Sequence, residues 1–320
     1  MATATARAVR FDRYGDRNVL YVADIDMPRP GADEVVVEVR AAAINPGEAA
    51  IRSGALHDLF PATFPSGEGS DLAGVVTAVG PGVGDFAVGD EVLGFSFQRS
   101  SHATHAVVPV QQLIRKPAQL SWAAAGSLYV VGATAYAAVR AVDPQPGETV
   151  AVSAAAGGVG SLVVQLLTLR QARVLGIAGP GNADWLRARS VTPIPYGDGL
   201  ADRLRAAAPN GIDAFIDLFG PDYIQVAVDL GVAPQRIDTI ISFAKAAEVG
   251  AKTEGSTDAS TREVLAEIAE LIASGALEFD IAATYPLDRV ADAFEELEKR
   301  HTHGKIVLLP NGSGSSSVHG

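Results

Sequence analysis

Short apolar runs separated by glycine and proline dominate the first 119 residues. We expect five of these runs to form β-strands: Arg7 to Phe11, Glu34 to Ile44, Leu72 to Val79, Glu91 to Phe95 and Ala103 to Val108. The densest turn segment between them is Gly80-Pro81-Gly82-Val83-Gly84. Such turns favour a small rolled or barrel-like sheet over an alternation of strands and helices.

The pattern changes at Ser121, which is a good helix N-cap, and an Ala/Val-rich helical sequence follows it towards Val142. After Gly147, strands and helices alternate, which is typical of a doubly wound parallel sheet. The strands expected in this part are Thr149 to Ser153, Arg173 to Ala178, Pro193 to Tyr196, Ile212 to Asp217 and Arg236 to Phe243.

From about Thr261 the chain contains an amphipathic helix, a short extended link, a second helix and a last strand, Lys305 to Leu309. We expect this returning segment to complete the first domain. The predicted organisation is therefore a β-rich domain at 1–120 completed by 260–310, and an α/β domain at 121–259. Residues 311–320 have linker composition, which predicts a disordered tail.

A glycine cluster lies between the strand Thr149 to Ser153 and the helix Val159 to Leu169. Measured against the G-x-G-x-x-G dinucleotide fingerprint, Gly157 and Gly160 fill the second and third positions, while Ala155 takes the first. The alternative interpretation is a tight turn that binds nothing. Because the strand and helix context is the one that the motif requires, we expect the phosphates of a dinucleotide to contact this turn and the N-terminus of the helix. The residues concerned are Ala156, Gly157, Gly158, Val159 and Gly160.

Composition narrows the class of protein. The 320 residues carry a formal net charge of −12, which disfavours nucleic acid and anionic membranes as partners and leaves a small-molecule substrate. The chain has no cysteine, so disulfides, thiolate metal sites and cysteine nucleophiles are excluded. We find no apolar run of about twenty residues and no signal-peptide pattern, and expect a cytoplasmic protein.

The six histidines do not form a pattern that binds metal, because no H-E-x-x-H motif or comparable carboxylate cluster is present. His102 and His105 are three residues apart in a segment expected to be a strand, where they would point to opposite faces. The sequence therefore predicts no metal site.

With these segments in place, the chain resembles the medium-chain dehydrogenase/reductase superfamily, and within it the zinc-independent quinone oxidoreductase (zeta-crystallin-like) branch. The resemblance extends nearly to Pro310 and rests on an ordered set of motifs: Asn45 to Gly54, Gly69 to Gly74 with Gly80 and Val83, Gly89 to Val92, Gly132 to Tyr136, Ala154 to Gly160 and His303 to Leu308. It implies a GroES-like catalytic domain, a Rossmann NADP-binding domain and, frequently, a homodimer.

The zinc-dependent branch has a His-Glu pair in the second of these motifs, where this chain has Ser70 and Asp71. The catalytic cysteine position of that branch falls near Asn45, and the cysteine-rich structural-zinc lobe has no counterpart here. The resemblance therefore implies chemistry without zinc.

The second strand of the α/β domain ends at Leu175 to Gly179 without the carboxylate that usually binds the adenine ribose of NAD. This absence favours NADPH, with Gly179 and Asn182 lining its site. The resemblance implies Tyr196 beside the adenosine phosphate and Arg300 reaching the same place. The other basic candidates are Arg187, Arg189 and Lys305, although both arginines could instead solvate a helix face.

Hydride transfer without zinc favours acceptors that already delocalise negative charge, such as quinones and α,β-unsaturated carbonyls. The resemblance puts Asn45 in the cleft floor as an amide donor and Thr134 near the nicotinamide. The alternatives are an Asn-Pro turn for Asn45 and a bond from Thr134 to its own helix. Ser242 and Phe243 end the strand Arg236 to Phe243, where open α/β sheets present their ligands.

Tyr129 and His57 are candidate proton donors, but a packed tyrosine and a surface histidine are the favoured interpretations, with solvent supplying the proton. Arg52 could orient an acidic substrate, although a salt bridge to Glu48, four residues earlier, is favoured. We therefore predict an NADPH-dependent quinone or enone reductase. The alternatives are an enoyl-thioester reductase and a non-catalytic NADPH-binding or sensor protein.

Overall fold

The structure is a computed structural model that describes residues 4–299 and 302–312. Residue contacts divide it into two compact units. Unit 1 comprises Met1–Val130, Thr261–Ala276 and Asp280–Gly320, and unit 2 comprises Val131–Ser260 and Leu277–Phe279. Most of the predicted disordered tail, and Arg300, lie outside the described residues.

Unit 1 is built mainly from antiparallel strands. Its elements are β1 (Thr5–Phe11), β2 (Tyr21–Asp26), β3 (Glu34–Ala43), α1 (Pro46–Ser53), β4 (Ser66–Gly67), β5 (Asp71–Val79), β6 (Glu91–Phe95), β7 (His105–Pro109), β8 (Leu113–Arg115), α2 (Trp122–Ala125), α9 (Arg262–Ala273), β14 (Ile281–Pro286), α10 (Val290–Glu298) and β15 (Lys305–Leu309). The larger sheet has the order β14-β15-β3-β5-β6-β8, with β7 also paired to β3, and the smaller one has the order β2-β1-β4.

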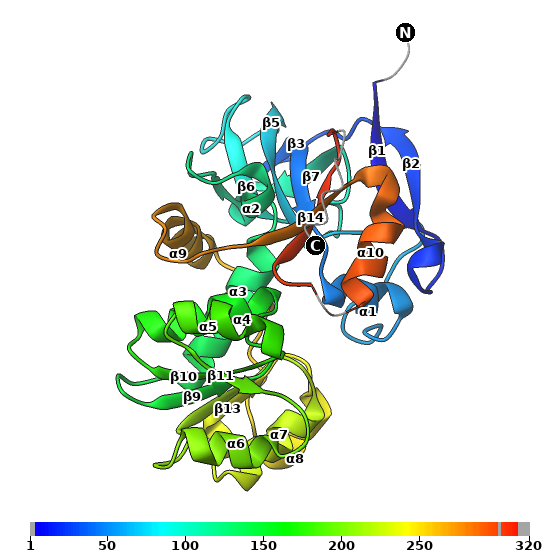
Figure 1. Ribbon diagram of the computed structural model, residues 1–320. Coiled ribbons are helices and arrows are strands. Elements are labelled where there is room, and N and C mark those ends of the chain that lie inside the picture. The colour runs from blue at the N-terminus through cyan, green and yellow to red at the C-terminus, as the bar shows by residue number, and fades with distance from the viewer. Residues whose placement is uncertain (1–3, 300–301, 313–320) are drawn as a thin grey trace. The chain divides into compact units, whose positions relative to one another are not determined.

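The long strand β3 organises this unit because it pairs with β5, β7 and β15. Its aliphatic side chains are buried in a core with residues of β5, β6 and β7. The chain enters α1 directly from the end of β3, so the residues at this junction are held by the most buried part of the sheet. α10 packs on β14 and β15, which return from the C-terminal part of the sequence (Figure 1).

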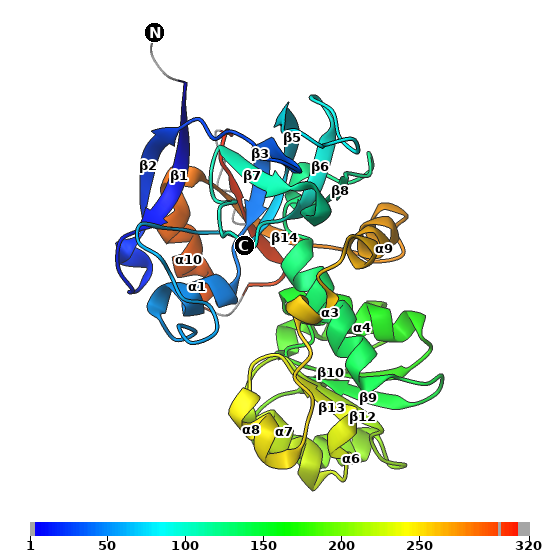
Figure 2. The ribbon, with the colours of Figure 1, turned by 180° about the vertical axis from the view of Figure 1, so that it is seen from behind.

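Unit 2 is a doubly wound parallel sheet. Its elements are β9 (Thr149–Val152), α4 (Gly158–Leu169), β10 (Arg173–Ala178), α5 (Ala183–Ala188), β11 (Thr192–Pro195), α6 (Leu200–Ala207), β12 (Ala214–Asp217), α7 (Pro221–Asp229), β13 (Ile237–Thr239) and α8 (Phe243–Val249), preceded by α3 (Tyr129–Val142). The strand order is β11-β10-β9-β12-β13, and every pair is parallel. Within this unit, α4 and α5 cover one face of the sheet and α6, α7 and α8 cover the other (Figures 1 and 2).

The predicted fold class, a Rossmann-type sheet with a β-rich GroES-like domain, is confirmed. Several predicted elements need correction. The strand expected from Arg236 to Phe243 ends at Thr239, and Phe243 instead begins α8. The extended link before α10 is a strand, β14, which pairs with β15. The strand expected from Ala103 begins only at His105, because Ala103 makes a single bridge to Ala8.

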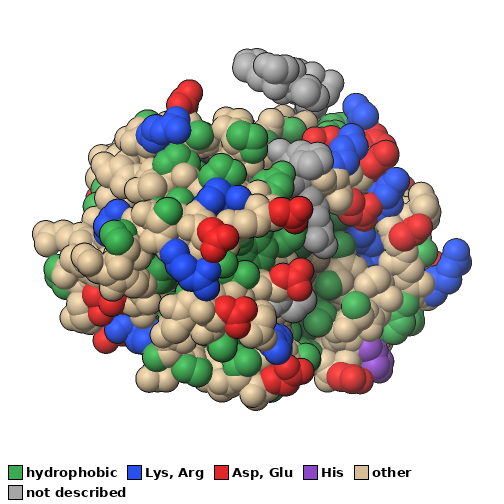
Figure 3. All heavy atoms as spheres, turned by 60° about the horizontal axis from the view of Figure 1, so that its bottom comes forward, with side chains coloured by type: hydrophobic (Ala, Val, Ile, Leu, Met, Phe, Trp, Pro, Cys, Tyr) green, Lys and Arg blue, Asp and Glu red, His purple; other side chains and the backbone are tan. Residues whose placement is uncertain are grey.

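Within the described residues, no helix is both long and apolar enough to cross a membrane. On the face seen in Figure 3, acidic and basic side chains are interspersed rather than segregated.

Candidate active site

The glycine turn joins the carboxyl end of β9 to the N-terminus of α4. The left-handed backbone conformation falls at Ala154, with φ of 48°, and the Gly157 N–H donates to the Ala154 carbonyl at 2.9 Å. A Cβ at Gly160 would lie only 2.1 Å from the same carbonyl oxygen, so the helix can approach the turn only with glycine at this position. The N–H groups of Gly158, Val159 and Gly160 are in the first turn of α4 and have no partner within the helix. The turn therefore fits a pyrophosphate, which accepts hydrogen bonds from such groups.

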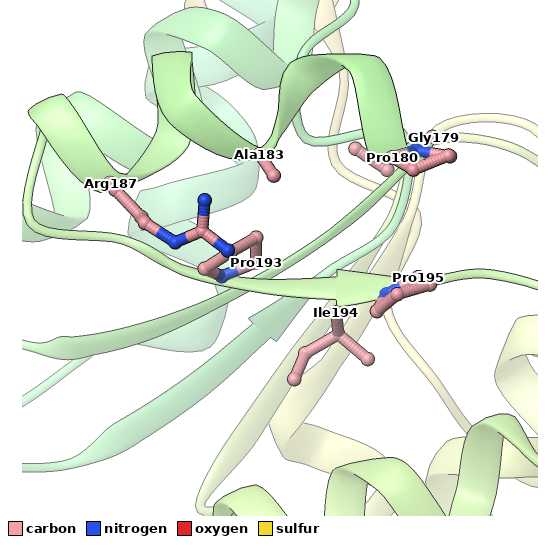
Figure 4. A pocket seen from close by; sticks show the side chains of 8 residues that line it. Gly179, Pro180, Ala183, Arg187, Pro193, Ile194 and Pro195 are labelled. Carbon is pink, nitrogen blue, oxygen red and sulfur yellow. The ribbon is translucent and has the colours of Figure 1, made fainter.

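An open pocket of about 300 Å³ lies beside the carboxyl ends of β10 and β11. Its lining residues are Ala178, Gly179, Pro180, Ala183, Arg187, Pro193, Ile194 and Pro195. Figure 4 shows the Arg187 side chain extending from α5 towards Pro193 at the edge of this pocket. The lining contains no carboxylate, so an added phosphate would meet a cation there and no anion among the lining residues.

Three of the predicted cofactor residues come together at this edge. A Cβ at Gly179 would lie 3.5 Å from Tyr196 Cε1 and 3.9 Å from Asn182 Nδ2.

Arg187 in α5 and Arg189 directly after this helix differ in their surroundings. The Arg187 guanidinium is exposed and paired with Asp184 at 2.7 Å, whereas Arg189 packs over the Trp185 ring and pairs with Glu278. Arg187 therefore lines the pocket with an exposed side chain that also pairs with Asp184 on its own helix, whereas Arg189 packs within unit 2.

The Asp217 carboxylate lies buried between the ends of β9, β12 and β13. It accepts hydrogen bonds from the hydroxyls of Ser153, Thr239 and Ser242 at 2.8–3.0 Å. Ser242 thus contributes to this cluster and donates its hydroxyl proton inward, while Phe243, the next residue, is about half exposed. Thr134 is buried in α3.

A second polar cluster is buried in unit 1, at the junction of β3 and α1. Lys305 Nζ donates to Asn45 Oδ1 at 2.6 Å and to the Ile44 carbonyl at 3.0 Å. The Asn45 amide nitrogen donates to Asp71 at 2.8 Å and to Glu48 at 3.3 Å. Asp71 also accepts the Val130 backbone N–H at 2.8 Å, so the cluster links β5, α1, β15 and the start of α3.

These contacts correct two predictions. Both N–H groups of the Asn45 amide are already bonded inside the protein, and the side chain is 2 % exposed, so Asn45 fixes the junction rather than donating to a substrate. Lys305 is buried beside Asn45 with its ammonium engaged, so it is not a surface ligand for a cofactor phosphate.

Burial dominates the electrostatics of this cluster. It raises the pKa of Asp71 to about 6, although Lys305 and the Asn45 amide stabilise the carboxylate. It lowers the pKa of Lys305, against the attraction of Asp71 and Glu48. It also lowers the pKa of His102, whose Nε2 donates to the Ala43 carbonyl at 2.9 Å, so this imidazole is held neutral.

Arg52 does not pair with Glu48 as predicted. It forms a buried ion pair with Glu68, and burial raises the pKa of Glu68 to about 8 against the effect of that arginine. Glu48 instead accepts hydrogen bonds from two backbone N–H groups, that of Asn45 at the N-terminus of α1 and that of Ser70. Tertiary contacts, and not the i,i+4 spacing from Glu48, therefore determine the partner of Arg52.

The two candidate proton donors are placed differently. Tyr129 is nearly buried, and its ring stacks on Phe95 with centroids 4.0 Å apart, as expected for a packing residue. His57 is exposed, and its Nδ1 lies 2.6 Å from the Tyr14 hydroxyl, which accepts the Ala62 N–H. Among the described residues, no group of three or more His, Cys, Asp or Glu side chains could hold a metal ion.

The sequence interpretation missed the roles of Asp217 and Glu68. Asp217 had a usable signal, because it is the last residue of a buried strand in a parallel sheet, where such sheets bind ligands. Glu68 had none, since its partner Arg52 lies sixteen residues earlier, in α1, and no local spacing relates the two.

Comparisons with known proteins agree with this architecture. Residues 31–118 match the family model described as alcohol dehydrogenase GroES-like domain, and residues 194–308 match the one described as zinc-binding dehydrogenase. The chain is 31 % identical to an Arabidopsis thaliana protein named NADPH-dependent alkenal/one oxidoreductase, chloroplastic, over 94 % of this chain and 78 % of that protein. It is 29 % identical to Quinone oxidoreductase 1 of Escherichia coli K12, over 95 % of this chain and 100 % of that protein.

The fold also matches solved structures. Escherichia coli quinone oxidoreductase complexed with NADPH superposes with a TM-score of 0.82 at 26 % identity, covering 95 % of this chain and 100 % of that chain. The two-unit fold, the glycine turn and these matches show that the chain belongs to the quinone oxidoreductase branch of the medium-chain dehydrogenase/reductase superfamily.

Proposed function

We propose that this protein is an NADPH-dependent oxidoreductase that reduces quinones or α,β-unsaturated carbonyls without zinc. The observation that carries the proposal is the glycine turn before α4 together with the carboxylate-free pocket at the end of β10. The turn fits a pyrophosphate, and Arg187 and Tyr196 lie where the adenosine end of the cofactor would follow. The relatives' names, which include an NADPH-dependent alkenal/one oxidoreductase and a quinone oxidoreductase, support the acceptor class.

The residues around Asn45 do not fit a zinc ion. The Asn45 side-chain oxygen, which would have to face a metal, already faces the Lys305 ammonium at 2.6 Å. A divalent cation at this point would be repelled by Lys305, and Asn45 and Lys305 are poor zinc ligands. This arrangement supports acceptors that do not need a Lewis acid.

Bound NADPH would supply a hydride to the acceptor. The protein's part is to hold the cofactor at the turn and the pocket, and the proton that completes reduction of a quinone to a hydroquinone comes from solvent. Asn45, Lys305 and Asp71 keep the β3–α1 junction rigid rather than transferring the proton.

Two measurements test the proposal. Titration of the apo protein should give an affinity for NADPH at least tenfold higher than for NADH, which corresponds to about 1.4 kcal/mol. NADPH oxidation should then be followed with phenanthrenequinone, a simple enone, an enoyl thioester and a saturated ketone. Turnover restricted to the thioester would favour the thioester reductase, and binding without turnover of any acceptor would favour a sensor. The expected homodimer stays a prediction, which light scattering of the purified protein would check.

A further inference from the structure

The Asp217 carboxylate is placed to order two loops rather than to stabilise the sheet alone. Its Oδ1 accepts from the Ser153 hydroxyl at 2.9 Å and from the N–H groups of Phe219 and Gly220 at 3.0 and 3.1 Å. These two amides belong to the loop that leaves β12 at its carboxyl end. One oxygen of the carboxylate therefore fixes the course of the chain at residues 218–220.

The other oxygen orders the loop that leaves β13. Asp217 Oδ2 accepts from the Thr239 and Ser242 hydroxyls at 2.8 and 3.0 Å. Because the Thr239 hydroxyl gives its proton to Asp217, its oxygen can accept the Ser242 and Ile241 N–H groups, at 3.0 and 3.3 Å. This relay ends the strand at Thr239 and directs the chain into α8.

The two loops carry large apolar side chains at the ligand-binding edge of the sheet. Phe219, Ile241 and Phe243 are 47 %, 47 % and 49 % exposed, while Asp217 beneath them is fully buried. In open α/β sheets, ligands bind outside the carboxyl ends of the strands, which is the edge where both loops lie. Half-exposed apolar side chains on an anchored base are suited to contact a flat ring.

We propose that Asp217 is a positioning residue that holds the loops 218–220 and 240–243 in the conformation that receives the nicotinamide end of the cofactor. The inference rests on the proposed function for the identity of the ligand, but the ordering of the loops can be measured without it. The carboxylate is needed because it accepts at both oxygens. An amide could accept at one oxygen only, and its NH₂ group would then face the Thr239 and Ser242 hydroxyls.

Asp217→Asn is the test variant, and Asp238→Asn is its matched control. Asp238 is also buried in the same sheet, one strand away, but its carboxylate bonds the Glu254 N–H and neither of the two loops. In the apo protein, Asp217→Asn should raise the rate of amide hydrogen exchange at residues 240–243 at least tenfold. In a titration with NADPH, the same variant should raise the Kd at least tenfold. Asp238→Asn should leave both values within twofold of the wild type.

If Asp217→Asn does not fold, Thr239→Val removes the relay hydroxyl at nearly constant volume and should raise exchange at Ile241 and Ser242. Unchanged exchange in the folded variants, or equal effects of Asp238→Asn, would overturn the inference. Failure of the wild type to bind NADPH would overturn the proposed function, while the exchange data would still decide whether Asp217 orders the loops.

Discussion

Lys305 donates a hydrogen bond of 2.6 Å to the side-chain oxygen of Asn45, although the two residues are 260 positions apart in the sequence. The ammonium is buried and faces Asp71 and Glu48 as its counter-charges. Through this contact, the first residue of β15 fixes the orientation of the amide at the start of α1. The junction therefore depends on a buried charge from the end of the chain.

Lys305→Met should lower the free energy of unfolding by about 3 kcal/mol, because it leaves buried carboxylates without their cation. Urea unfolding at neutral pH would measure the loss. Lys299→Met is the control, since Lys299 pairs with Glu296 on the surface at 2.9 Å, and should cost less than about 1 kcal/mol. In the double variant with Asp71→Asn, the loss should be smaller than the sum of the single losses. Additive losses would show that the pair is not coupled.

The Asp71 carboxyl should make stability depend on pH. Burial raises its pKa from 3.8 to about 6, so between these values the folded state binds more protons than the unfolded state. The free energy of unfolding therefore falls as pH rises through this window, by about 3 kcal/mol in total from this group. Asp71→Asn removes this contribution.

The readout is the difference in unfolding free energy between the wild type and Asp71→Asn, measured by urea unfolding from pH 4 to 7.5. The wild type should lose stability relative to the variant as pH rises. Other groups, such as His102, titrate in both proteins and largely cancel. A difference that stays constant over this range would mean that the Asp71 pKa is not raised.

Local patterns predicted most of the elements and failed where a distant side chain intervened. The strands Glu91 to Phe95 and Arg173 to Ala178 coincide with β6 and β10, because their apolar runs are bounded by turn residues. The strand predicted to Phe243 stops at Thr239 because the Thr239 hydroxyl bonds Asp217, which is 22 residues away. The glycine turn is a contiguous motif and could be found from sequence.

The hydrogen-bond partners of the Asn45 side-chain amide could not be predicted from local patterns. The residues that use both N–H groups of Asn45 include Asp71, which only the pairing of β3 with β5 brings close. Likewise, spacing alone could not separate Arg187, which lines the pocket, from Arg189, which stacks on Trp185. Charge patterns identified Arg187 and Arg189 as candidates, and only their packing distinguishes the two side chains.

Arg187→Ala should raise the Kd for NADPH about tenfold and leave the Kd for NADH unchanged, because the guanidinium lines the carboxylate-free pocket. Fluorescence titration with both cofactors gives the two constants. Arg205→Ala is a close control, since Arg205 pairs with Asp202 three residues earlier and is 55 % exposed, compared with 62 % for Arg187. Equal weakening of NADPH and NADH binding would remove Arg187 as the group that recognises the 2′-phosphate.

Gly157→Asp should abolish cofactor binding while the protein stays folded. The backbone at Gly157 has φ of −78°, which any residue can adopt, and a Cβ there would approach only the Ala154 carbonyl, at 3.3 Å. The added carboxylate would therefore be tolerated by the fold but would repel the cofactor phosphates. Gly84→Asp, at an open position of unit 1, controls for the added charge. A folded Gly157→Asp variant that still binds NADPH would place the cofactor elsewhere.

Activity should not depend on a metal ion. The chain has no cysteine, Ser70 and Asp71 stand where the zinc branch has its His-Glu pair, and Asp71 is bonded to the Asn45 amide at 2.8 Å. A saturated alcohol needs help to lose its proton, which zinc provides by lowering the pKa of the bound oxygen, so such alcohols should be poor substrates. A quinone needs no such help, and its reduction should be unchanged after treatment with a strong chelator. Elemental analysis paired with assays before and after chelation is the measurement. One zinc per chain whose removal abolishes quinone reduction would contradict the proposed mechanism.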